Sequence, residues 1–560
     1  MVRKIIGLVN REIVNIHDAA YFLAFFTFLS QILALFRDRS LTYFFGAGEM
    51  LDIYYASFRI PDLIFIATSS FISVSIVIPF LQDKISEGRE KAKQFVDNLF
   101  TTFFLLVIVV CTAAFVLMPW LTELLFSGLS SETIESIVHY SRILLLSPIL
   151  MGVSNLFASI TQVNKRFILY AMCPIIYNLA ILLGIIVLQP FFGLNGVIAG
   201  VIIGAVLHGL VQIPFVGKTG LMPDIVMPIN FKLIKDVLLI SIPRTITLVS
   251  SSAVLIGLVA LASHMATGSI SIFNLAQNLQ SVPLVIIGLS YSMAAFPMLA
   301  KLFSTGEKKK FIETIVVSTK HIIFLSLPVV ALFVVLRAQI VRVVLGSGNF
   351  SWEDTRLTAA CLAIFAISAV AQSLCLLFVR AYYAIGSTKK PLVVNVLSSI
   401  VIMILPLGFV FLFKEFPGFL HFLEYVFKIP DIVGTEVIAL PLGFTIGTIL
   451  NAIIFFFVME RDFKGVWKEV KKTLFQSFSA SILIGFATYI GLNIFDNFFD
   501  LERVWGIFFQ GLLAGLLGLT VGAVVLHILG SKELVEVGKT LRRRLWKHPE
   551  VIVPDQSEIK

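Results

Sequence analysis

Arginine side chains stand inside otherwise apolar stretches of this 560-residue chain, at Arg59, Arg244 and Arg380, and at the end of one such stretch, at Arg37. A charged side chain at the centre of a bilayer costs about 2.5–3.5 kcal/mol on insertion scales, so a charge there indicates a function. The planar guanidinium donates two hydrogen bonds at once, which suits phosphate. The sequence therefore predicts a water-filled cavity in which these arginines bind an anionic headgroup.

Other polar side chains accompany the arginines and are expected to complete the cavity. The expected neutral contacts are Gln31, Gln277 and Asn278. Asp38 and Arg39 are expected to form an ion-paired gate with Asp52, which lies about two turns before Arg59 on the same helix face. A second interpretation stays open, in which the arginines pair with these acids or extend to the membrane surface.

No motif in the sequence resembles a catalytic or cofactor site. The cysteines have neither C-x-x-C spacing nor a histidine cluster nearby, so we expect neither a metal nor a disulfide. Gly-rich phosphate loops, H-E-x-x-H and acidic metal motifs are also missing from the sequence. It therefore predicts no catalytic residues, no metal and no cofactor, and it argues against an enzyme.

The elements that must hold these side chains are membrane-spanning helices. The chain is 58% hydrophobic and 14% charged, whereas soluble domains are about 45–50% apolar and about 25% charged. Since a spanning helix needs about 20 mostly apolar residues, we expect an all-α polytopic membrane protein with about 14 transmembrane helices. The expected spans are 19–44, 51–82, 96–122, 137–163, 166–189, 193–216, 237–263, 268–300, 316–343, 354–384, 389–413, 435–458, 472–496 and 505–530.

The positions of Lys and Arg predict the orientation of these spans. Most of the 43 lie in segments such as REKAK, GEKKK, VWKEVKK and LRRRLWK, on the side of the membrane that holds both ends of the chain. Because basic loops stay in the cytoplasm, both termini are expected there, in a multi-pass protein of the bacterial inner membrane. Anionic lipid headgroups then account for the net charge of +9, and nucleic acid is not an expected partner.

Two similar halves are expected within this set of helices. Spans 51–82 and 268–300 carry matching proline pairs, and parallel repeats are common in transporters. We therefore expect two pseudo-symmetric six-helix bundles plus two C-terminal helices. The predicted segments are a cytoplasmic amphipathic segment 1–18, an N-terminal lobe 19–216, a cytoplasmic linker 217–236, a C-terminal lobe 237–458, two helices 472–530 and a basic cytoplasmic tail 531–560.

Three stretches of the sequence resemble the MurJ (MviN) family of lipid II flippases, which belongs to a superfamily with multidrug antiporters and polysaccharide exporters. The first, FRDRSLTYFFGAGEMLDIYYASFRIPDLIF, is similar to the family's R-D-x6-F-G-A-G-x3-D-x4-A-F-x2-P-x-L pattern. The second is SPILMGVSNLFASITQVNKRFILYAMCPIIYN, and the third is RAYYAIGSTKKP. The residues that match in the first stretch are Arg37, Asp38, Phe45, Gly46, Ala47, Gly48, Asp52, Phe58 and Pro61.

The resemblance implies a flippase that moves a lipid-linked peptidoglycan precursor from the inner to the outer leaflet by alternating access of two lobes. It implies a cationic cavity for the pyrophosphate and sugars, and a groove beside the two C-terminal helices for the polyprenyl tail. The expected partners are the lipid-linked glycan, membrane lipids and proteins of cell-wall synthesis, and the chain is expected to be a monomer. Cell-wall biogenesis and cell shape are the processes that such a flippase serves.

The chain also departs from the family pattern, which leaves alternatives open. Gln31, Phe65 and Asn278 stand where the family has arginines, and TSSFI replaces an acidic A-E-G-A-F segment. A flippase for another polyprenyl-linked glycan fits these departures, as does a transport-inactive scaffold of cell-wall synthesis. A drug or cation antiporter would need buried acids rather than arginines, and a membrane glycosyltransferase would need larger loops.

Overall fold

The chain folds into helices. The computed structural model describes residues 16–72, 74–164 and 166–546, and no strand occurs among them. The helices of the first half are α2 (Ile16–Phe45), α3 (Glu49–Ser57), α4 (Arg59–Ser69), η1 (Ser70–Ile72), α5 (Val74–Glu87), α6 (Arg89–Leu125), α7 (Ser131–Leu144), α8 (Leu146–Val163), α9 (Phe167–Leu183), η2 (Gly184–Leu188), α10 (Gln189–Phe192), α11 (Leu194–Leu210) and α12 (Ile213–Thr219). Those of the second half are α13 (Phe231–Ala262), α14 (Ser269–Pro283), η3 (Leu284–Leu289), α15 (Ser290–Ser304), α16 (Lys308–Val335), α17 (Arg337–Val344), α18 (Trp352–Ala384), α19 (Lys389–Glu415), α20 (Pro417–Phe427), η4 (Thr435–Ile438), α21 (Ala439–Asp462), α22 (Val466–Asp496), α23 (Val504–Ile528) and α24 (Lys532–Trp546).

The all-helical membrane architecture predicted from composition is confirmed. Thirteen helical segments in the described part of the chain are long and apolar enough to cross a membrane. The expected span 19–44 corresponds to α2, which is not among the thirteen. Of the predicted amphipathic segment 1–18, residues 1–15 lie outside the described residues.

The second expected span, 51–82, is broken into several short helices. α3 ends at Ser57, and α4 begins two residues later with Pro61 in its first turn. Pro is tolerated there because the first N–H groups of a helix have no partner within the helix. Phe58 accepts the first hydrogen bond of the new helix, from the N–H of Asp62 at 2.8 Å. The break lets α3 and α4 present different faces to their neighbours.

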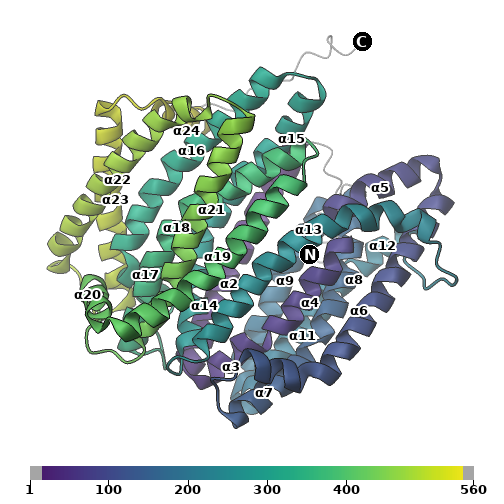
Figure 1. Cartoon of the computed structure of the whole chain (residues 1–560), viewed down its shortest axis with the longest axis horizontal. Helices are drawn as coiled ribbons and strands as arrows, with labels where there is room; N and C mark the ends of the chain where they lie inside the picture. The colour runs from purple at the N-terminus through teal and green to yellow at the C-terminus, as the bar shows by residue number, and fades with distance from the viewer. Residues whose placement is uncertain (1–15, 73, 165, 547–560) are drawn as a thin grey trace. The chain divides into compact units, whose positions relative to one another are not determined.

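Contacts divide the described chain into two compact units. The first contains the described residues up to Val282 together with Val341–Ser368 and Gly386–Asn451. Its main core is formed by buried side chains of α4, α5, α6 and α8, among which Phe95, Phe103 and Leu156 are almost completely inaccessible. In this unit α13 packs along α19 (Figure 1).

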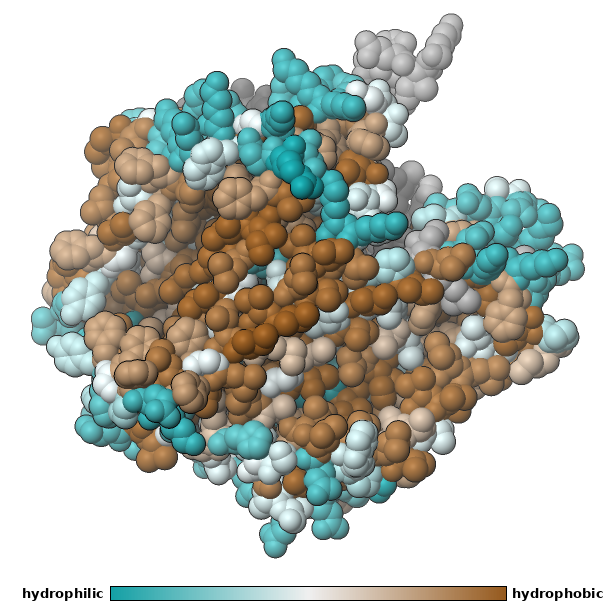
Figure 2. Space-filling view, viewed as in Figure 1, coloured by the Kyte–Doolittle hydropathy of each residue, from teal (hydrophilic) through white to brown (hydrophobic). Residues whose placement is uncertain are grey.

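Apolar side chains also cover the outside of the first unit. Figure 2 shows a continuous apolar surface over the region of α13 and α19. On α19 the exposed side chains include Leu397, Ile400 and Ile404, which recur at helical spacing. Such exposure would be unfavourable in water but not in lipid, because acyl chains are as apolar as these side chains.

The second unit contains Pro283–Ile340, Ala369–Ile385 and the described residues from Ala452 onward. Here α22 packs against α16 on one side and against α23 on the other. The glycine face of α23 permits the close approach, because a Cβ at Gly518 would meet Thr488 and a Cβ at Gly522 would meet Ile484. Small residues at this spacing commonly allow transmembrane helices to pack closely.

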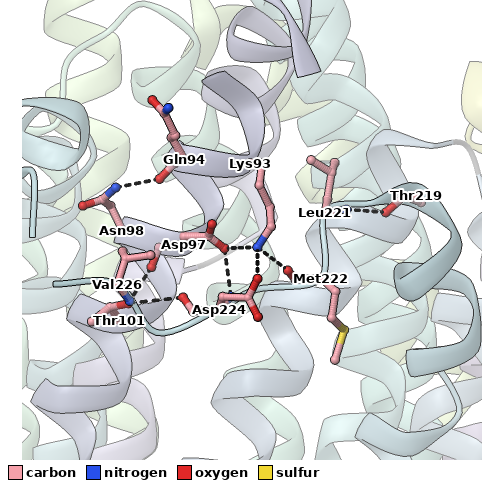
Figure 3. A network of polar contacts seen from close by, with 10 residues as sticks. All are labelled: Lys93, Gln94, Asp97, Asn98, Thr101, Thr219, Leu221, Met222, Asp224 and Val226. Carbon is pink, nitrogen blue, oxygen red and sulfur yellow. Dashed lines mark hydrogen bonds and ion pairs between the residues drawn. The ribbon is translucent and has the colours of Figure 1, made fainter. Parts of the chain in front are cut away.

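The segment that follows α12 is held against α6 by a polar network (Figure 3). The Lys93 ammonium group contacts Asp97 at 2.5 Å and Asp224 at 2.6 Å, and it donates to the Met222 carbonyl at 2.7 Å. The N–H of Asp224 donates to the same Asp97 carboxylate at 2.8 Å. Further along, Asn98 accepts from the N–H of Asn230 at 2.6 Å. The connection between α12 and α13 is therefore an ordered part of the first unit.

Candidate functional site

A stripe of neutral polar side chains runs along α14 in the first unit. Ser271, Asn274, Asn278 and Ser281 are spaced by three, four and three residues, which places them on one face of the helix. We call this set the α14 polar stripe. Each of its members forms a hydrogen bond with α2, α3 or α4, so the stripe joins three helices of the N-terminal half to one helix of the C-terminal half.

Asp52 on α3 binds the beginning of α14. Its carboxylate accepts hydrogen bonds from the N–H of Gly268 at 2.6 Å, from the N–H of Ser271 at 2.7 Å and from the Ser271 hydroxyl at 2.5 Å. The side chain is buried. The first N–H groups of a helix lack acceptors within the helix and carry partial positive charge. A carboxylate from another helix supplies the missing acceptors and a compensating negative charge. Asp52 thus fixes the start of α14 to α3.

Arg59 on α4 reaches the next position of the stripe. Its Nη2 donates to the side-chain carbonyl of Asn274, which is itself buried. Within the described residues its Nε is buried and has no hydrogen-bond partner. Asp62, one turn further along α4, has an exposed side chain. Arg59 therefore keeps its charge and one unused donor, as required of a residue that binds an anion.

Arg37, in the second half of α2, has a different set of partners. Its Nε and Nη2 contact Asp38 at 3.0 and 2.8 Å, and its Nη1 donates to Asn178 of α9 at 3.4 Å. The second oxygen of Asp38 accepts from the side-chain amide of Asn278 at 3.0 Å. The buried carboxylate of Asp38 neutralises the arginine and connects it to the stripe.

The predicted ion pair between Asp52 and the charged residues of α2 is not formed in the described structure. The carboxylate of Asp52 instead accepts hydrogen bonds from the start of α14. Arg39 instead donates to the carbonyl oxygen of Val343 at 2.6 Å and to that of Val344 at 3.3 Å. These carbonyls belong to the last turn of α17, where helix dipoles favour cations. Arg39 and Asp52 therefore both bind helix ends rather than each other.

The remaining predicted site residues are distributed more widely. Gln31 of α2 approaches Ser281 of the stripe at 3.5 Å, a long and weak contact. Gln277 is half-buried on α14, beside Asn278. Arg380 lies in the second unit, where it donates to the Leu289 carbonyl at 3.4 Å among other contacts. Arg244 belongs to α13, and its side chain lies outside the described residues.

A cavity of about 310 Å³ follows α4 beyond Arg59, also within the first unit. Its polar lining consists of hydroxyl and amide groups only, from α4, η1, α8 and α13. The lining residues are Phe65, Ile66, Ser69, Ser70, Asn155, Leu248, Ser251, Ser252 and Leu255. Neutral groups of this kind can hydrogen-bond sugars or amides, but they supply no charge.

Three polar residues of this region were not anticipated from the sequence. Ser271 donates a hydrogen bond to Asp52, and Asn274 accepts one from Arg59. Asp62 adds an exposed carboxylate close to Arg59 along α4. The available signal was the three–four–three spacing of small polar residues in SISIFNLAQNLQS, which identifies one helix face. It does not reveal which other helices that face contacts.

A sequence model of the family described as "Lipid II flippase MurJ" matches residues 41–510 of the chain. The probable lipid II flippase MurJ of Borreliella burgdorferi is 25% identical over 517 residues, covering 91% of this chain and 96% of the relative. The probable lipid II flippase MurJ of Thermotoga maritima is 28% identical over 379 residues, covering 67% of this chain and 76% of that protein.

Solved structures show the same fold. A lipid II flippase MurJ in an inward closed conformation superposes with a TM-score of 0.71 at 21% identity, covering 93% of this chain and 99% of the other. An inward-facing multidrug resistance transporter of the MATE family, in the MOP superfamily, gives a TM-score of 0.63 at 15% identity, covering 78% and 96%. The fold is therefore shared between lipid flippases and drug transporters, and the site must distinguish them.

Proposed function

The chain belongs to the lipid II flippase MurJ family, and on this premise we propose that it carries lipid II from the inner to the outer leaflet by alternating access of its two lobes. The relatives named as lipid II flippases match it across most of their length. Peptidoglycan biosynthesis is the process that this transport serves.

The observation that supports a substrate role most directly is the state of Arg59. Its guanidinium has a neutral amide as its hydrogen-bond partner, retains a buried Nε without a hydrogen-bond partner, and interacts electrostatically with Asp62. A pyrophosphate offers the acceptors that such a group lacks, and a charge-assisted hydrogen bond is worth about twice a neutral one. The nearby hydroxyl-lined cavity supplies donors and acceptors suited to a sugar or peptide portion. Arg244, in the same unit as Arg59, is proposed as a further cationic contact of the substrate, and Arg380 is proposed as a cavity residue of the second unit.

The gate is proposed to consist of the contacts that join the α14 polar stripe to α2 and α3. Asp38 accepts from Asn278 and Asp52 accepts from Ser271, which are two of these contacts. Arg39 is proposed to support the gate from outside the stripe, through its hydrogen bond to the end of α17. Separation of these contacts would open the site on that side of the membrane. The division into an N-terminal lobe 19–216 and a C-terminal lobe 237–458 remains our proposal for the moving parts.

The orientation is proposed from the distribution of basic residues. Both termini are placed in the cytoplasm of a bacterial cell, with the protein in the inner membrane. An inside-negative potential then drives an anionic headgroup outward, with about 2.3 kcal/mol available per charge per 100 mV. We further propose that the chain acts as a monomer without catalytic activity, and that the polyprenyl tail follows α22 and α23.

Complementation of a strain depleted of its lipid II flippase tests this function. Wild-type protein is expected to restore growth, whereas Arg59→Ala at equal expression is expected to fail. Arg503→Ala is the matched control, because this arginine is exposed and pairs with Asp500 at 3.2 Å. Failure of the wild-type protein to rescue would refute lipid II as the cargo, and full rescue by Arg59→Ala would refute the proposed site.

A further inference from the structure

A larger cavity, of about 840 Å³, lies between α6, α7 and α8 in the first unit, apart from the α14 polar stripe. Its wall is mostly apolar, with residues such as Cys111 and Ile149, but one edge is charged. Glu135, His139 and Arg142 provide that edge from successive turns of α7. Since none of these three takes part in the transport site described above, the cavity requires its own explanation.

The lining of this cavity changes from acidic to basic to apolar along α7 and α8. Glu135 and His139 lie nearer the start of α7, Arg142 lies in its last turn, and Ile149 follows on α8. Glu135 and Arg142 are separated by about 10 Å along the helix axis, as two turns require. A phospholipid has the same sequence of groups, with an amine outermost, then a phosphate, then acyl chains.

Arg142 is oriented but not neutralised. Its Nε donates to the Phe115 carbonyl at 3.1 Å, and its guanidinium lies 4.7 Å from the centre of the Phe115 ring. Among the residues that the structure describes, no carboxylate forms an ion pair with Arg142 and no base forms one with Glu135. A cation and an anion therefore face the same cavity with their charges uncompensated.

Arg142 lies a short distance inside the membrane interface, within reach of a phosphate there. Phe115 on α6 precedes the exposed Trp120 by five positions, or about 7.5 Å of helix. Tryptophan is enriched at the membrane interface, and the side chains just inside it meet the boundary between headgroups and acyl chains. Long cationic side chains at that level extend toward phosphate.

We propose that this cavity binds a zwitterionic ethanolamine phospholipid, whose phosphate contacts Arg142 and whose ammonium contacts Glu135. The acyl chains occupy the apolar part of the cavity near Cys111 and Ile149. A choline headgroup lacks the N–H donors that Glu135 would accept, and a glycerol headgroup lacks the positive charge. The bound phospholipid would therefore be separate from the substrate that the protein transports.

Native mass spectrometry of the purified full-length protein tests the proposal. After exchange into detergent with equal amounts of phosphatidylethanolamine, phosphatidylcholine and phosphatidylglycerol, the wild-type protein is expected to retain phosphatidylethanolamine preferentially. Arg142→Gln is expected to reduce its retention about tenfold, the loss of one charge-assisted contact. Glu135→Gln is expected to remove the preference over phosphatidylcholine while leaving total lipid retention in place.

Matched controls are Glu132→Gln on α7 and Arg503→Gln, neither of which lines the cavity. Should Arg142→Gln not fold, Glu135→Gln still tests the site, because that side chain is exposed. Equal retention of the three lipids by the wild-type protein, or unchanged preference in Glu135→Gln, would overturn the proposal. So would a photo-crosslinker at Thr112, which lines the cavity, if it captured a protein rather than a lipid.

Discussion

Arg59 of α4 donates a hydrogen bond to the side-chain carbonyl of Asn274 on α14, although 215 positions separate them in the chain. The contact holds the arginine in place through a neutral group, so its charge is not cancelled. Asp38 has the opposite effect on Arg37, whose charge it neutralises directly. We therefore propose different roles for these two arginines, with Arg59 available to an anion and Arg37 part of the scaffold.

Asn274→Asp is expected to slow transport strongly. The new carboxylate would pair with Arg59 and compete with the anionic substrate, which we expect to lower the transport rate about tenfold or more. Asn274→Ala leaves Arg59 without this neutral partner but still charged, so its rate should remain within about threefold of wild type. Transport of labelled lipid II in proteoliposomes measures both. Equal activity of Asn274→Asp and wild type would contradict the role of Arg59.

Asp52→Ala is expected to destabilise the protein. It removes the acceptor of the Gly268 and Ser271 N–H groups, and each buried donor left without a partner costs about 1–3 kcal/mol. Thermal unfolding in detergent, followed by tryptophan fluorescence, should show a lower midpoint. Asp83→Ala on α5, an exposed position, is the control. An unchanged midpoint in Asp52→Ala would show that the start of α14 is held by other contacts.

Glu533, at the start of α24, is expected to make stability depend on acid pH. Burial alone raises the pKa of this carboxyl, but hydrogen bonds from Thr473, its own N–H and Ser531, with the charge of Lys320, hold the pKa below its usual 4.5. A carboxyl with a lowered folded-state pKa stabilises the fold above its unfolded-state pKa, and this contribution is lost as pH falls through the folded-state pKa.

The wild-type protein should therefore unfold at a higher temperature than Glu533→Gln at pH 7. The difference should shrink as pH falls below about 4.5, since protonation makes the wild-type side chain neutral as well. Thermal unfolding midpoints of the two proteins at pH 7 and at pH 4 measure this difference. Glu502→Gln, an exposed position, should show no such pH-dependent difference. A difference that is constant from pH 7 to pH 4 would contradict the prediction.

Lys93→Met is expected to loosen the connection between α12 and α13. The substitution leaves Asp97 and Asp224 close together without the ammonium that both contact. Trypsin should then cut faster after Lys218, in the last turn of α12 directly before this connection. Lys91→Met is the control, since Lys91 is exposed and contacts only Glu87 at 3.3 Å among the described residues. Identical cleavage rates in the two variants would show that the network does not order the segment.

Hydropathy alone predicted most of the helices. The expected span 389–413 corresponds to α19 (Lys389–Glu415), and 505–530 corresponds to α23 (Val504–Ile528). Hydropathy reports how much apolar surface a segment has, and this is sufficient where lipid is the surrounding solvent. It did not reveal α20 (Pro417–Phe427), which is too short to span a membrane, or the separation of α3 from α4.

The site was less predictable than the fold. The types of the charged residues were identifiable, but their partners depend on which helix faces meet. Arg37 is an example. Adjacent residues on a helix do not normally face each other, but the Arg37 side chain forms a hydrogen bond with its neighbour Asp38. The family resemblance indicates the fold and substrate class, whereas the pairing of Arg59 with Asn274 depends on how α4 and α14 pack against each other.

The α14 polar stripe is built from amides and hydroxyls, and such groups can either give or take a hydrogen bond. Asn274 takes one from a cation and Asn278 gives one to an anion, so one helix serves partners of opposite sign. In the proposed gate opening, in which α14 separates from α2, α3 and α4, the exposed face of α14 would carry no charge that has to be hydrated. An interface of this kind can open and close repeatedly at a small electrostatic free-energy cost, because water or substrate can replace each hydrogen-bond partner that is lost.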